Sequence, residues 1–201
     1  VADLAFDPKG RRIATATYGG VRLWLARIAD QRPTTLAYAG SHVATIFSPD
    51  GRFVMSSMQD NQLHGWRLND GRDMRMGGYP GKVKSMAFLA DGMLMATSGA
   101  TGAVAWPFGG ANGPMGKEAS EIGVDAASRV VAVAATPRDT LLAAGTDDGR
   151  VWIADLKSSR REMVKAEKGP EITALALSPD GRRIAWGDEE GEAGVSDSPL
   201  A

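Results

Sequence analysis

The chain contains no cysteine among its 201 residues. This absence excludes disulfide bonds, thiolate metal sites and a cysteine nucleophile. Histidine is also scarce, because only His42 and His64 are present, and no His-Xaa-Xaa-Xaa-His pair offers metal-ligand spacing. No Gly-Xaa-Ser-Xaa-Gly sequence marks a serine nucleophile. We therefore predict no catalytic residue, no metal ligand and no cofactor, and we expect both histidines to be structural.

The chain also lacks a dominant charge and a long apolar run. It carries 23 basic and 24 acidic side chains, well mixed, for a formal net charge of -1. Nucleic-acid binding needs a basic face or stripe, so we predict no nucleic-acid partner. No apolar run reaches the length of about 18 residues that a membrane span needs. The chain starts with Val1 rather than Met, so we expect the natural protein to begin earlier, and the cytoplasm is the default compartment.

A phrase centred on proline returns every 41 to 47 residues along the chain. It reads Phe-Ser-Pro-Asp-Gly-Arg at Phe47–Arg52 and Leu-Ser-Pro-Asp-Gly-Arg at Leu177–Arg182. Looser copies begin at Phe6, Phe88 and Ala135. Repetition at this period is typical of one supersecondary unit that is copied and stacked. Such a unit cannot bury its apolar face alone, and surfaces made of repeats mostly bind other molecules.

Each repeat has the same internal order, which the second repeat shows most clearly. An alternating apolar segment at 43–47 is followed by the Pro-Asp-Gly turn, in which Pro presets φ and Gly accepts a positive φ. Two further segments, at 53–57 and 63–66, flank a polar turn. Period-two patterning predicts strands, and four short antiparallel strands per repeat predict the blade of a β-propeller. The expected blades cover 1–41, 42–81, 82–128, 129–170 and 171–201.

One long segment departs from this order. The stretch from Pro107 to Ser128 is rich in glycine and proline at its start. We interpret it as an extended loop of the third blade. If the chain contains a short helix, we expect it here, around Lys117 to Glu121.

In these turns the chain resembles the WD40 repeat family over essentially its whole length. Ser48–Gly51 is similar to that family's turn between the first and second strands, and Asp148–Val151 is similar to its Asp-Gly turn. Ala154-Asp155 stands at the terminal Trp-Asp position, with Ala in place of Trp. The resemblance implies an all-β propeller of four-stranded antiparallel blades. About five repeats are present, and rings of the family usually close with seven blades, so we expect a fragment of a seven-bladed ring.

The resemblance also implies a structural tetrad, in which a histidine before the first strand is joined to a Ser or Thr, an Asp and the Trp. His42, Ser56, Asp60 and Trp66 match this set, in the second blade. The other repeats depart from the pattern, so packing must hold those blades together.

In the propellers that this chain resembles, partners usually dock on one face of the ring, made by two kinds of loop. These loops join the outer strand to the next inner strand, and the second strand to the third. Aromatic residues and Met are enriched in interface cores. The resemblance thus implies a non-enzymatic scaffold that presents a loop face to a protein or peptide partner, and Tyr18 and Tyr79 are the first candidates. The predicted partner-binding residues are Tyr18, Met58, Gln59, Asn61, Tyr79, Lys82 and Asp147.

Two alternatives remain open. Pro-Asp-Gly turns also occur in propellers of the TolB type and in some hydrolytic propellers. The second hypothesis is therefore a propeller hydrolase or a sensor of a small ligand or cation. The acidic run Asp188–Glu192 could serve such a site, although it lacks the alternating pattern of a calcium loop and fits a solvated turn better. A third hypothesis is a structural protein that oligomerises by pairing its open strand edges with those of another copy.

Overall fold

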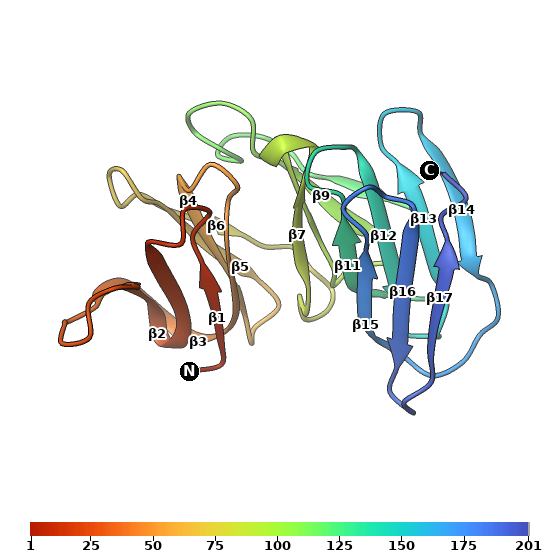
Figure 1. Ribbon diagram of the computed structural model, residues 1–201, viewed down its shortest axis with the longest axis horizontal. Coiled ribbons are helices and arrows are strands. Elements are labelled where there is room, and N and C mark those ends of the chain that lie inside the picture. The colour runs from red at the N-terminus through yellow and green to blue at the C-terminus, as the bar shows by residue number, and fades with distance from the viewer. Residues whose placement is uncertain (201) are drawn as a thin grey trace. The chain divides into compact units, whose positions relative to one another are not determined.

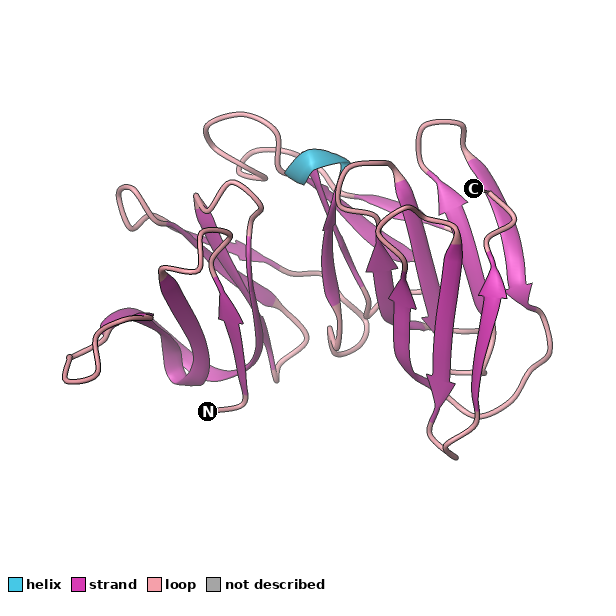
Figure 2. Cartoon of the chain, in the orientation of Figure 1, coloured by secondary structure: helices cyan, strands magenta, loops and turns pink. Residues whose placement is uncertain are grey.

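The computed structural model describes residues 1–200, and its regular structure consists almost entirely of strands (Figures 1 and 2). Within these residues there are seventeen strands and one three-residue 3-10 turn, η1 (Ala90–Gly92). No helix in this range has the length and hydropathy that crossing a bilayer requires. The predicted all-β class with four-stranded antiparallel blades is confirmed. The chain divides into two compact units, one from Val1 to Val83 and one that begins at Lys84.

The first unit is one continuous antiparallel sheet of six strands in sequence order. Two of its strands have fourteen residues each, and each of them supplies two of the strands that a blade needs. β2 folds back on itself, since the Ala26 amide donates to the Arg11 carbonyl at 2.8 Å. β3 pairs with β2 through its first half and with β4 through its second half. Six assigned strands therefore make two four-stranded blades: β1 (Asp3–Phe6), β2 (Arg12–Leu25), β3 (Thr34–Phe47), β4 (Phe53–Met58), β5 (Leu63–Arg67) and β6 (Asp73–Met76).

Glycine makes the fold in β2 possible. Gly19 and Gly20 have φ of 82° and 143°, conformations that residues with a side chain rarely adopt. A Cβ on Gly20 would also collide with the carbonyl oxygen of Leu36 on β3. The Gly-Gly pair thus closes the hairpin and lets the neighbouring strand approach.

The second unit contains three sheets, which Figure 1 shows side by side. The first is β7 (Met86–Leu89), β8 (Leu94–Thr97), β9 (Ala103–Pro107) and β10 (Ser120–Ile122). The second is β11 (Val130–Ala135), β12 (Leu141–Thr146), β13 (Val151–Asp155) and β14 (Arg160–Lys165). The third is β15 (Ile172–Leu177), β16 (Arg183–Asp188) and β17 (Ala193–Asp197).

Apolar clusters hold these three sheets together. One joins Leu89 and Ala96 of the first sheet to Leu142 and Trp152 of the second. The other joins Ile153 of the second sheet to Ile172 and Ile184 of the third. Because each cluster lies between neighbouring sheets, every blade of this unit is stabilised by the next one, as in other stacked repeats.

The repeated turn owes its shape to local hydrogen bonds. The Ser48 hydroxyl donates to Asp50 Oδ1 at 2.7 Å and accepts from the Phe53 amide at 2.9 Å. Asp50 Oδ1 also accepts from the Arg52 amide at 2.9 Å, and Gly51 has φ of 70°. Serine, aspartate and glycine each fill a distinct requirement of this turn, which explains why the phrase recurs in the sequence.

The short helix expected around Lys117 to Glu121 is absent. The chain makes successive turns over residues 111–116, and Ser120–Ile122 then forms β10, which pairs with β9. Gly110, Gly113 and Gly116 all have positive φ, a backbone geometry that no right-handed helix contains. The expectation is wrong, because the positive-φ glycines keep the chain in turns up to residue 116 and residues 120–122 then pair with β9 as the outer strand of the blade.

Candidate interaction surface

Three turns of the first unit bring polar side chains together. Tyr18, at the fold of β2, lies opposite Ser41 of β3. The Ser41 carbonyl accepts from the Gln59 amide at 3.0 Å, and the Gln59 side chain accepts from the Lys82 ammonium group. We call the surface made by Tyr18, Ser41, Gln59 and Lys82 the loop surface. It joins residues that are 64 positions apart in the chain, from position 18 to position 82.

Tyr18 supplies the aromatic side chain of the loop surface, and 82% of its area is exposed. Ser41 and Gln59 are exposed beside it, whereas Lys82 is half-buried. Asn61 is also half-buried and adopts a φ of 58°, which suits its place in the turn after β4. The loop surface therefore offers a phenol ring together with an amide and a cation.

Two of the predicted partner-binding residues are buried. Met58 is 1% exposed and Tyr79 is 8% exposed, and Tyr79 has contacts of its own. Met58 lies opposite His42, and Gly40 leaves the room that its side chain fills, because a Cβ there would lie 2.8 Å from Met58 Cε. Our expectation that both side chains are accessible to a partner is wrong. Flexible Met and large Tyr fill gaps beneath the turns instead.

Asp147 belongs to the second unit and is not included in the loop surface. Its carboxylate accepts from the Arg129 amide at 2.8 Å, and its own amide donates to the Arg129 carbonyl at 2.9 Å. This reciprocal pair fixes the start of β11 against the turn after β12. The carboxylate remains exposed.

A buried histidine holds the backbone of this region in place. His42 Nε2 donates to the Tyr38 carbonyl at 3.2 Å, and His42 Nδ1 lies 3.0 Å from the Ser56 hydroxyl. The Ser56 hydroxyl has one proton, which it donates either to His42 Nδ1 or to the Ala44 carbonyl, 2.8 Å from Ser56 Oγ. These bonds tie β3, where it passes from one blade to the next, to β4. The position of Ser41 in the loop surface follows from this network.

The second histidine lies in an aromatic stack beside the first. The ring centroids of Tyr38 and His64 are 3.5 Å apart at 17°, and Trp66 packs edge-on against His64 at 4.8 Å. His64 Nε2 is 3.1 Å from Asp73 Oδ2 but is not aligned for a hydrogen bond. Burial lowers the pKa of His64 and outweighs the opposing charge of Asp73. Burial also lowers the pKa of His42, so both rings are neutral at neutral pH.

The predicted tetrad is assembled in part. His42 bonds to Ser56 and lies 5.7 Å from the Trp66 ring. The Asp60 carboxylate accepts from the Gln62 amide instead of from His42, and Gln62 in turn accepts from Arg75 on β6. Asp60 therefore contributes only its charge, which opposes the lowering of the pKa of His42.

Sequence reasoning missed Tyr38 and His64 as members of this cluster. One signal for His64 was its position two residues before Trp66 on the same strand, since residues two apart in a strand share a face. Tyr38 gave no comparable signal, because its stacking depends on how β3 lies across β5.

The acidic run near the end of the chain forms a turn. Asp188 is buried, and its carboxylate accepts from the amides of Glu190 and Glu192 at 3.1 and 2.9 Å. Within residues 1–200, no group of three His, Asp or Glu side chains is placed to hold a metal ion.

No family model matches this chain. It is 24% identical over 196 residues to WD repeat-containing protein 55 of Bos taurus, a match that covers 94% of the chain and 50% of that protein. It is 34% identical over 67 residues to Protein LST8 homolog of Drosophila melanogaster, covering 33% of the chain and 21% of that protein. The chain thus spans half or less of the curated relatives that it matches.

Proposed function

We propose that this chain, whose repeats resemble those of the WD40 family, is a non-enzymatic interaction scaffold that docks a protein or peptide partner on its loop surface. The resemblance to the family is confirmed by the relatives and by the blades, and it supports a protein-interaction role in general. The observation that carries the finer proposal is the exposed ring of Tyr18 within a set of hydrogen-bonded turns.

The physical argument rests on what an exposed tyrosine offers to a partner. Its ring supplies a large apolar area, and its hydroxyl can make one hydrogen bond at the same time. Gly19 and Gly20 hold Tyr18 at a tight fold that His42 and Ser56 support through β3. The backbone at Tyr18 is therefore ordered before a partner binds, so a partner has to order only its side chain. Tyrosine is among the residues that contribute most binding energy at interfaces.

The test is affinity purification of the full-length protein from its source cells, followed by mass spectrometry. We expect a stoichiometric protein partner with the wild type and a much weaker recovery with Tyr18→Ala. Ile28→Ala is the matched control, because Ile28 is also an exposed apolar residue but follows the far end of β2. Equal recovery of the partner with all three proteins would remove the loop surface from the binding site.

A further inference from the structure

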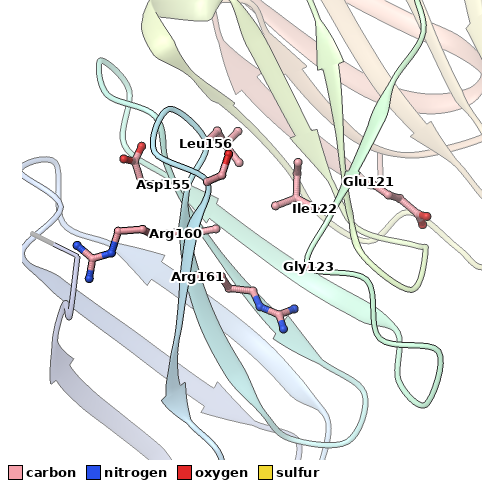
Figure 3. A pocket seen from close by; sticks show the side chains of 9 residues that line it. Glu121, Ile122, Gly123, Asp155, Leu156, Arg160 and Arg161 are labelled. Atoms are coloured by element: carbon pink, nitrogen blue, oxygen red, sulfur yellow. The ribbon is translucent and has the colours of Figure 1, made fainter.

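A groove opens within the second unit between two outer strands, and none of its lining residues belongs to the loop surface. Its main part is a cavity of about 320 Å³ between β10 and the turn that joins β13 to β14 (Figure 3). Ile122, Ala154 and Leu156 give it apolar walls. A smaller cavity of about 30 Å³ shares Gly123 and Arg161 with it. We call the two together the β10–β14 groove.

The groove exists because the outer strand of its blade is short. β9 runs from Ala103 to Pro107, but β10 has three residues and pairs only with Ala103–Ala105. The preceding chain makes turns over residues 111–116 instead of extending the strand. The sheet that faces β13 and β14 is consequently narrower at this end, and apolar side chains remain partly open.

The register of β13 and β14 decides which side chains face the groove. Arg161 lies opposite Ala154, and Met163 lies opposite Trp152, so these four side chains share one face of the sheet. Arg160 precedes Arg161 and points to the other face. Figure 3 shows the Arg161 guanidinium directed toward Gly123 and the Arg160 guanidinium directed away from it. Arg150 and Arg160 also line the groove, but Arg150 is paired with Asp125 and Asp148, and Arg160 is directed away and lies 3.6 Å from Glu162. Among residues 1–200, Arg161 therefore supplies the one guanidinium group of the groove that has no carboxylate partner.

Arg161 has no acidic partner within residues 1–200. Its guanidinium lies over the Trp152 ring, 5.9 Å from the centroid, and no carboxylate is within ion-pair distance. Glu121 lines the groove, but its carboxylate points away from Arg161 (Figure 3). A guanidinium beside apolar walls favours a carboxylate, which it can bind through two parallel hydrogen bonds.

The other carboxylates near the groove already have partners. Asp155 accepts from the Thr140 and Ser158 hydroxyls, and these bonds hold its pKa at about 2. Asp125 and Asp148 both accept from Arg150. Residues 1–200 therefore supply no group that neutralises Arg161.

We propose that the β10–β14 groove binds an extended peptide that carries a carboxylate side chain between apolar side chains. The carboxylate pairs with Arg161, and the apolar side chains cover Ile122, Ala154, Leu156 and the exposed Met163. β10 and β14 are edge strands of their sheets, so their outward backbone groups can bind the peptide main chain. This site shares no residue with the loop surface, and the proposal does not rest on the proposed function.

The experiment uses three synthetic nonapeptides that differ only at the central residue. In each, Leu stands two positions before and two positions after the centre, because residues two apart lie on one face of an extended chain. The centre is Glu, Gln or Lys, and the other positions are Ser and Gly. Binding to the full-length protein is measured by fluorescence polarisation, and the amide signals of Ile122, Gly123 and Ala154 are followed by NMR.

We expect the Glu peptide to bind about tenfold more tightly than the Gln peptide and to shift these three amide signals. Arg161→Gln removes this preference, whereas Arg160→Gln, the matched control on the opposite face, retains it. Arg161→Glu reverses the preference toward the Lys peptide, which shows that the variant remains folded. Tyr18→Ala leaves all peptide affinities unchanged.

Four outcomes would overturn the proposal. One is the absence of saturable binding at millimolar peptide. Another is equal affinity for the Glu and Lys peptides. The third is a Glu preference that survives Arg161→Gln. The fourth is a set of amide shifts confined to residues outside the groove.

Discussion

Arg150 links two segments of the second unit, and its removal gives the sharpest test of how that unit is held together. Its guanidinium donates to Asp148 at 2.8 Å, to Asp125 at 2.8 Å and to Ser128 at 3.1 Å. Asp125 and Ser128 lie in the loop after β10, whereas Asp148 lies in the turn between β12 and β13. One side chain therefore fastens the loop of one blade to the turn of the next.

The exposed fractions of these side chains set the size of the effect. The side chains of Arg150 and Asp148 are each 20% exposed, and that of Asp125 is 38% exposed. Breaking a fully buried ion pair costs about 3–5 kcal/mol, whereas exposed pairs contribute about 0–1 kcal/mol. For this intermediate burial we expect Arg150→Ala to lower the free energy of unfolding by about 2–3 kcal/mol.

The assay is urea denaturation of the full-length protein, with Arg160→Ala as the matched control. Arg160 is exposed, and its guanidinium is 3.6 Å from Glu162, so its loss should cost less than about 0.5 kcal/mol. Arg150→Lys should recover only part of the loss, because an ammonium group cannot bind two carboxylates through a planar fork. If Arg150→Ala costs no more than Arg160→Ala, the network is an ordinary surface pair and the reasoning fails.

The same network predicts that its contribution to the free energy of unfolding is lost in acid. Burial tends to raise the pKa of Asp148, but hydrogen bonds from Arg150, Thr146 and Lys168 outweigh it and hold that pKa far below its usual range. A carboxyl group with a lowered folded pKa contributes stability above its unfolded pKa of about 3.9 and loses it as the pH falls further. The difference between wild type and Arg150→Ala should therefore be constant from pH 5 to 7 and shrink below about pH 4.

Three further outcomes are expected. Burial lowers the pKa of His42 and His64, so the unfolded chain binds a proton at each ring more readily than the folded chain does. The free energy of unfolding should therefore be highest above about pH 6.5 and fall below it by up to about 1.4 kcal/mol per pH unit for each ring. Urea denaturation at pH 5 and 8 measures this difference. Gly20→Ala should cost at least about 3 kcal/mol of unfolding free energy because of its collision with β3, whereas Gly19→Ala, with open space around it, should cost about 1–2 kcal/mol. Tyr18→Ala should weaken binding of a purified partner by about 1–3 kcal/mol, measured by calorimetry, without a change in melting temperature.

The blades could be predicted from the sequence because their turns are specified by nearby residues. Ser48, Asp50 and Gly51 form their bonds within six positions of one another, so the phrase alone defines the reversal. The strand after the turn, β4, is buried at all six positions, so its continuous run of apolar and small residues indicated a strand. Local chemistry and fold agree here, and the prediction succeeded for that reason.

The site was harder to predict, because exposure depends on contacts between distant segments. Met58 and Tyr18 both lie at the ends of second strands, yet one is buried and the other open. The difference arises from Gly40, whose missing side chain leaves space for Met58. The β10–β14 groove had no sequence signature either, since it results from a strand that stops early opposite β9.

β3 joins the two blades of the first unit as one continuous strand, which the repeat pattern of the sequence does not indicate. Its fourteen residues supply the outer strand of one blade and the inner strand of the next, without a loop between them. Although Ser41 is exposed, a cut between residues 41 and 42 would divide β3 itself and not a linker, so it would disrupt both blades. A transplantable module of this chain has to begin and end within a turn, such as Ser48–Arg52, where the strand pairing is already interrupted.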